Sequence, residues 1–126
     1  MPRRRGRGYI PPLHNIIKSW IRAMEFAAET GRFPAAISDI FGVAATELKG
    51  EAIEHWVELF KKEENRVRLA IRWALNYARK MYHYDTEKVI AKVKEAFTEL
   101  IKAGVIKKEV YNAMCEKEGI PALKVE

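Results

Sequence analysis

The feature that most constrains the fold is the stretch from Glu51 to Tyr84, which contains neither proline nor glycine. Apolar residues recur along it at three- and four-residue spacings, the period of an amphipathic helix. As one helix its 34 residues would extend about 50 Å at roughly 1.5 Å per residue, whereas a compact chain of this length has a radius of gyration of about 14 Å. The stretch is therefore one protruding helix or two helices, with any break expected in the polar string from Lys61 to Asn65.

The rest of the chain also has helical periodicity, and no segment alternates convincingly as a strand. The further helices that we expect span Leu13–Thr30, Ala35–Phe41, Thr86–Ala103 and about Lys107–Glu118, with Asp85 and Thr86 suited to cap the third. A glycine follows each of them and is typical of a helix end: Gly31, Gly42, Gly104 and Gly119. The prediction is an all-α fold, a bundle of four main helices plus one short helix.

Positive charge is concentrated at the N-terminus. Four arginines bring +4 within the first ten residues, where there is no acidic residue, and the total is only +6. Pro11 and Pro12 end this arm, because proline fixes its own φ and biases the preceding residue away from helix. We expect a basic arm, residues 1–12, that is disordered alone in water, followed by a single helical domain, residues 13–126.

The composition bears on membrane insertion, on cysteine chemistry and on the source of the protein. The longest stretch without Asp, Glu, Lys or Arg is the ten residues from Gly8 to Ile17, too short to cross a bilayer, so we expect no membrane insertion. Cys115 is the only cysteine and is expected to be a small buried side chain rather than a reactive thiol. Gln is absent and 32% of residues are charged, a composition that leans toward a hyperthermophilic source.

No pattern in the sequence supports catalysis or metal binding. His14, His55 and His83 are far apart, and the Glu-x-x-His pairs that di-iron bundles require are missing. Glu47, Glu51, Glu54 and Glu58 share one predicted helix face, which is more typical of a solvated acidic surface than of a metal site. Nucleophile elbows, phosphate-cradling loops and zinc signatures are also absent from the sequence. We therefore expect no enzymatic activity, no metal and no cofactor.

Basic residues in two places are suited to phosphate. The guanidinium groups of the arm remain charged at any relevant pH and match phosphate oxygens in geometry, although a solvated or targeting tail has the same composition. On the long stretch, if it is one helix, three basic residues project within about 40° of Arg68 and form a line. The predicted helix Leu13–Thr30 and its end add four more, although ordinary exposed charges explain such lines equally well. The candidate phosphate contacts are Arg3, Arg4, Arg5, Arg7, His14, Lys18, Arg22, Arg32, Lys61, Arg68, Arg72 and Arg79.

Two other patterns compete with this interpretation. The segment from Ile37 to Trp56 is similar to a helix-turn-helix with Gly42 in its turn, but the supposed recognition helix is acidic and a major groove flanked by phosphates repels such a surface. Tyr77, Tyr82, His83 and Tyr84 surround two basic residues and could stack on single-stranded bases, whereas at helical spacing they more often pack in a core or an interface.

The arm Met1-Pro-Arg-Arg-Arg-Gly-Arg-Gly, the proline break and the small helical bundle together resemble the α-helical major capsid proteins of filamentous archaeal viruses, of the Pyrobaculum and Thermoproteus type. The resemblance implies a virion protein, made in the host cytoplasm, whose dimers wrap linear double-stranded DNA and hold it in A-form. It also implies that N-terminal segments lie against the nucleic acid, that the second subunit is a copy or a paralogue, and that an envelope can surround the filament. The modest charge of the body departs from what a DNA-condensing protein would show.

The leading hypothesis is therefore a structural nucleoprotein, a capsid subunit that encloses double-stranded DNA non-specifically through phosphate contacts and assembles into a helical filament. The alternatives are a small helix-turn-helix transcription regulator and an archaeal chromatin-like protein.

Overall fold

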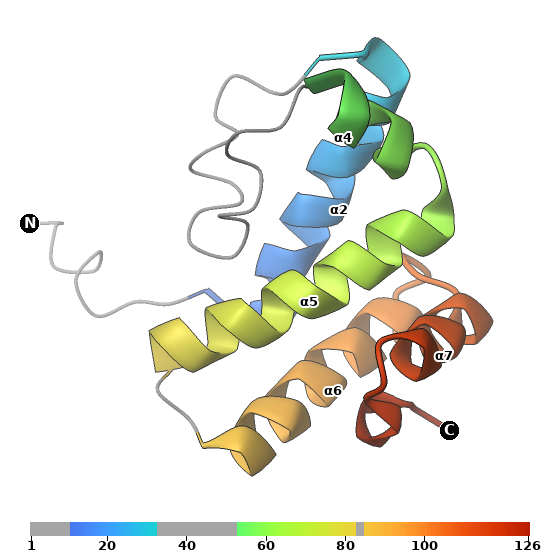
Figure 1. The fold of residues 1–126 in the computed structure, drawn as a ribbon. Helices are drawn as coiled ribbons and strands as arrows, with labels where there is room; N and C mark the ends of the chain where they lie inside the picture. Colours follow the sequence, from blue (N-terminus) through green and yellow to red (C-terminus); the bar gives the residue numbers. More distant parts are fainter. Residues whose placement is uncertain (1–10, 33–52, 83–84) are drawn as a thin grey trace, which may run out of the picture.

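The computed structural model describes residues 11–32, 53–82 and 85–126. These residues form helices and no strand, in agreement with the predicted all-α fold (Figure 1). The basic arm up to residue 10 and the predicted helix Ala35–Phe41 lie outside the described residues. The elements are α2 (Leu13–Thr30), α4 (Ile53–Phe60), α5 (Glu63–Tyr82), α6 (Thr86–Lys102), α7 (Lys108–Lys117) and the short 3₁₀ helix η2 (Pro121–Leu123).

The long stretch without proline or glycine is two helices. α4 ends at Phe60, α5 begins at Glu63, and the chain changes direction between them (Figure 1). The break lets α4 pack against α2 and bury Trp56 and Phe60, which a straight rod would carry away from the core. Arg66 helps to hold the corner, because its Nη1 donates a 2.7 Å hydrogen bond to the carbonyl oxygen of Phe60, one of the carbonyls that the end of α4 leaves unpaired. The continuous-helix alternative is wrong.

α2 packs against α4, α5 and α6, and α5 packs in addition against α4, α6 and α7. Trp20 of α2 meets two rings of α5 edge-on, with centroids 6.3 Å from Trp73 and 5.7 Å from Tyr77. On the other side of the core, the rings of Phe97 and Tyr111 stack with centroids 4.7 Å apart and join α6 to α7. The core is thus built from large side chains on five helices, and the largest fully buried ones are Trp20, Trp73, Tyr111, Phe60 and Phe97.

Helix ends follow the local signals of the sequence. Asp85 caps α6, and its Oδ1 accepts a 2.9 Å hydrogen bond from the backbone N–H of Lys88. Gly31 ends α2 with φ 77°, a left-handed conformation that glycine adopts without a Cβ clash. Both ends confirm the prediction.

The C-terminal residues return along α7 and η2. The hydroxyl of Tyr111 donates a 2.7 Å hydrogen bond to the carbonyl oxygen of Leu123, and both residues are fully buried. Asn112 makes a reciprocal pair with the backbone of Val125, at 2.8 Å and 2.9 Å. These bonds fix residues 120–126 against α7 and thereby complete the core on that side.

Membrane crossing requires a helix that is both long and apolar. None of the helices in residues 11–32, 53–82 and 85–126 combines these two properties.

Candidate nucleic-acid interface

α5 is the most strongly basic of the described helices. From residue 66 to residue 80 it has five basic residues and no acidic one: Arg66, Arg68, Arg72, Arg79 and Lys80. Arg68, Arg72 and Arg79 project within about 40° of each other on α5. Arg79 is exposed and the Arg72 side chain is 41% exposed, whereas Arg68 is half-buried and the buried Leu75 lies on the same side. We call these three residues the α5 arginine line. At about 1.5 Å per residue the line is roughly 16 Å long, enough to pass several phosphates of a duplex.

Two asparagines orient the ends of the α5 arginine line. Arg68 Nη2 donates to Asn65 Oδ1 at 3.3 Å, and Arg79 Nη1 donates to Asn76 Oδ1 at 3.4 Å. Each asparagine is three residues before its arginine, a spacing at which side chains on a helix are neighbours. A neutral amide oxygen positions a guanidinium group without cancelling its charge.

Two residues of the line, Arg68 and Arg72, are paired with a carboxylate of another element. Oε2 of Glu118 lies 3.8 Å from Arg68 Nη1 and 3.5 Å from Arg72 Nη2. Sequence analysis did not identify this contact, because Arg72 and Glu118 are 46 residues apart and only tertiary packing of α7 on α5 brings them together. The line is therefore basic, but its charge is partly neutralised from within the molecule.

Lys61 does not belong to the α5 arginine line, contrary to the prediction for a continuous helix. It lies in the turn between α4 and α5, where its Nζ is 2.8 Å from Oε2 of Glu58. The hydrogen bond and charge of Lys61 lower the pKa of the Glu58 carboxyl below its usual value. The break at residues 61–62 thus removes Lys61 from the register that would have aligned it with Arg68.

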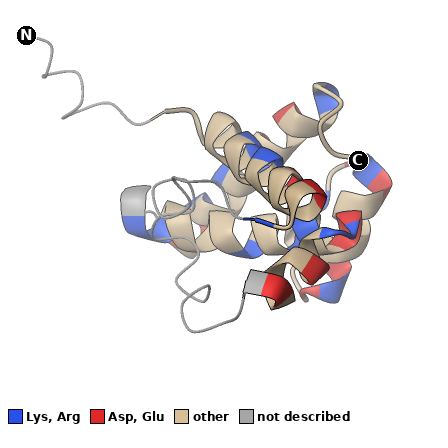
Figure 2. Ribbon diagram, turned by 90° about the horizontal axis from the view of Figure 1, so that it is seen from above, with Lys and Arg blue, Asp and Glu red and all other residues tan. Residues whose placement is uncertain are grey.

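The basic residues of α2 form a separate group. Lys18 and Arg22 are exposed, Arg22 Nη1 lies 3.2 Å from Glu25 Oε1, and Arg32 is exposed just beyond the helix end. The contacts of Trp20 place α2 against Trp73 and Tyr77, roughly 140° around α5 from the α5 arginine line. The two predicted groups therefore lie on different sides of the bundle. Figure 2 shows basic and acidic residues interspersed over most of the helices.

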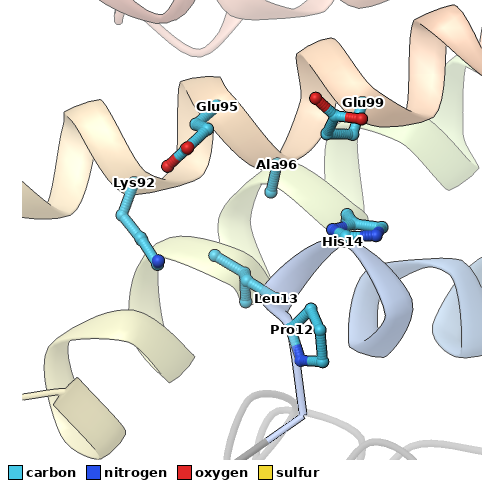
Figure 3. A pocket seen from close by; sticks show the side chains of 7 residues that line it. All are labelled: Pro12, Leu13, His14, Lys92, Glu95, Ala96 and Glu99. Atoms are coloured by element: carbon cyan, nitrogen blue, oxygen red, sulfur yellow. The ribbon is translucent and has the colours of Figure 1, made fainter.

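His14 lies in a cleft of about 300 Å³ between the start of α2 and the middle of α6. The cleft also contains the side chains of Lys92, Glu95 and Glu99, and Figure 3 shows the His14 ring beside Glu99. Two carboxylates against one lysine make this cleft a poor site for phosphate. The structure therefore favours excluding His14 from the interface that the sequence predicted.

Of the aromatic residues that could stack on bases, only Tyr77 has a described side chain. Tyr77 packs on Trp20 and its hydroxyl has a pKa raised by burial, as expected for a core residue rather than a base-stacking platform. The side chains of Tyr82, His83 and Tyr84 lie outside the described residues.

The segment that is similar to a helix-turn-helix also lies mostly outside the described residues. Its last part is the start of α4, where Glu54 and His55 are exposed. No three His, Cys, Asp or Glu side chains in the described ranges are placed to hold a metal ion. Cys115 is fully buried, as predicted, and burial raises the pKa of its thiol.

Comparison with known proteins adds no relative. No family model matches the chain, and no curated protein or solved structure is detectably similar to it.

Proposed function

We propose that this chain is a structural nucleoprotein, a major capsid subunit that binds and encloses double-stranded DNA through its phosphates. The observation that carries the proposal is the α5 arginine line, three guanidinium groups within about 40° of each other on a helix whose residues 66–80 include no acid. Guanidinium groups bind phosphate oxygens in a bidentate geometry and keep their charge at any relevant pH. Of the described surfaces, this one is best suited to a polyanion.

Binding of this kind has no base specificity. Contacts to phosphate fix the position of a protein on a duplex but carry no direct sequence information. Such binding is strongly salt-dependent, because each neutralised phosphate releases condensed counterions. The subunit would therefore coat DNA of any sequence.

The N-terminal arm supplies the second set of proposed phosphate contacts, after the α5 arginine line. Its four arginines contribute +4 of the net +6, so the helical body alone has little charge with which to neutralise DNA. The resemblance to filamentous archaeal virus capsid proteins supports a role inside a virion, with a copy or a paralogue as the second subunit of a dimer and DNA held in A-form. The α2 group, on another side of the bundle, is then free to contact a neighbouring subunit or a second DNA segment.

The helix-turn-helix alternative is less well supported. The part of its recognition helix that the structure describes exposes Glu54, and a carboxylate on that surface is repelled by the phosphates that flank the major groove. An archaeal chromatin-like protein would use the same phosphate contacts as a capsid subunit, and the two differ in whether ordered filaments form.

Fluorescence anisotropy with two 30-base-pair duplexes of unrelated sequence tests the proposal. We expect equal affinities and a steep loss of affinity with salt. Arg79→Gln should weaken binding several-fold and flatten the log–log salt slope by about 0.9, whereas Lys94→Gln on α6, with the same loss of charge, should change affinity less than about twofold. A strong preference for one duplex, or equal effects of the two substitutions, would contradict the proposal.

A further inference from the structure

Glu118 occupies a position that is unfavourable for a carboxylate by itself. It directly follows α7, and the unpaired carbonyl groups at a helix C-terminus give that end a partial negative charge. Its side chain is nevertheless only 18% exposed, because it turns toward α5 and one oxygen, Oε2, approaches both Arg68 and Arg72. The two arginines therefore offset the charge of a residue that its own helix disfavours.

The arrangement resembles the contact that a phosphate would make. A carboxylate oxygen bridging two guanidinium groups uses the donors that a phosphate oxygen needs. The Arg72 side chain is 41% exposed, so an incoming phosphate can reach it without a rearrangement of the core. Glu118 and a phosphate therefore compete for the same donors.

We propose that Glu118 is an internal competitor of phosphate, which holds the α5 arginine line in a low-affinity state until the polyanion displaces it. This inference rests on the proposed function and names the residue that sets the affinity of the same surface. Weak binding by a free subunit favours exchange between DNA segments, whereas many adjacent subunits on one duplex displace their Glu118 side chains together. Glu118 would thus bias the protein toward binding DNA as an assembly.

The chain offers a matched control for Glu118. Glu116 lies two residues earlier and therefore on another side of α7, where its Oε2 is 2.5 Å from Nζ of Lys124. Glu116→Gln and Glu118→Gln change the net charge by the same amount, so general electrostatic attraction to DNA increases equally in both variants. Any difference between them reports the position of Glu118 beside Arg68 and Arg72.

The experiment measures duplex affinity by anisotropy over a salt series for the full-length chain and both variants, with helical content checked by circular dichroism. We expect Glu118→Gln to bind about three- to tenfold more tightly and to steepen the salt slope by up to about 1.8, for two freed phosphate contacts at roughly 0.9 each. Glu116→Gln should change affinity less than about twofold.

A second pair of variants, Arg72→Gln in the unmodified chain and in the Glu118→Gln background, tests whether the change in affinity depends on Arg72 and not on a general loosening of α7. Arg72→Gln should weaken binding more in the Glu118→Gln background than in the unmodified chain, because Arg72 has lost its contact with the Glu118 carboxylate there. The role of Glu118 would be overturned if Glu118→Gln and Glu116→Gln changed duplex affinity equally and Arg72→Gln weakened binding by the same factor in both backgrounds. That result would leave the proposed function intact. A full-length chain that binds no duplex at low salt would instead overturn the proposed function itself.

Discussion

A hydrogen bond between Arg66 and Phe60 holds the turn between α4 and α5. The guanidinium group of Arg66 donates a 2.7 Å hydrogen bond to the last backbone carbonyl of α4. The corner turns α4 onto α2 and leaves α5 to begin a new register. As a result, α5 presents its arginine line without Lys61.

Replacing Arg66 tests the role of this corner. Arg66→Met retains the aliphatic part of the side chain and loses a hydrogen bond from a charged donor to a half-buried carbonyl, so we expect the free energy of unfolding to fall by about 1 to 2 kcal/mol. Arg22→Met is the matched control, because Arg22 is exposed and pairs within its own helix; it should cost at most about 0.5 kcal/mol. Thermal and denaturant unfolding measure both, and equal losses would contradict the assignment.

Tyr111 predicts how the protein responds to alkaline pH. Burial, chiefly, together with the neighbouring Cys115, raises the pKa of Tyr111 in the folded state, whereas an unfolded tyrosine ionises near pH 10. Above about pH 10 the unfolded chain loses a proton that the folded chain keeps, so the unfolded state is favoured. The free energy of unfolding should then fall by about 1.4 kcal/mol per pH unit from the titration of this residue, which should contribute no pH dependence below about pH 10.

Tyr111→Phe separates this effect from the other titrating groups. The variant should be less stable by about 1 to 2 kcal/mol at neutral pH, because the buried carbonyl of Leu123 loses its hydrogen-bond donor. Its stability should decline less steeply between pH 10 and 12 than that of the unmodified chain, while Tyr77 and Cys115 titrate in both. Parallel pH profiles for the two chains would contradict the assignment.

Cys115 should be unreactive in the folded protein. The thiol is fully buried and its pKa is raised by burial, and only the thiolate is a nucleophile. A disulfide reagent at neutral pH should therefore react with Cys115 at a rate that follows the unfolding equilibrium and increases steeply near the midpoint of a denaturant titration. A fast reaction without denaturant would show that the α7 core opens locally.

The sequence predicted most helix bounds because the signals are local. The capping carboxylate of Asp85 and the glycine at residue 31 act within a few residues of the ends that they define, and α2 has the predicted bounds. The break lies at residues 61–62, within the polar string where a break was expected. The sequence leaves open whether the stretch breaks at all, because that depends on burial of α4 against α2, a tertiary effect that periodicity does not contain. The 3₁₀ helix η2 was missed because its backbone is held by α7.

The candidate site was predictable to a similar degree. The shared side of Arg68, Arg72 and Arg79 follows from helical geometry alone and is present in the structure. The pairing with Glu118 was not predictable, because it depends on how α7 packs on α5. Nor did spacing along α2 show that His14 would lie beside the carboxylates of α6.

Removal of the arm tests its share of the DNA contacts. Deleting Met1 to Gly8 should flatten the log–log salt slope of duplex binding by up to about 3.6, since each of four lost phosphate contacts is worth roughly 0.9. The deleted residues precede the first described helix, so thermal stability should not change. An unchanged slope would show that the arm does not bind phosphate and would leave binding to the helical body.

Electron microscopy of the purified protein mixed with linear double-stranded DNA tests the central claim most directly. A capsid subunit that encloses DNA through phosphate contacts should form ordered helical filaments of constant diameter on duplexes of any sequence, at low salt, with a length that follows the length of the DNA. Binding confined to one sequence, or irregular aggregates without helical order at every protein-to-DNA ratio, would contradict the account.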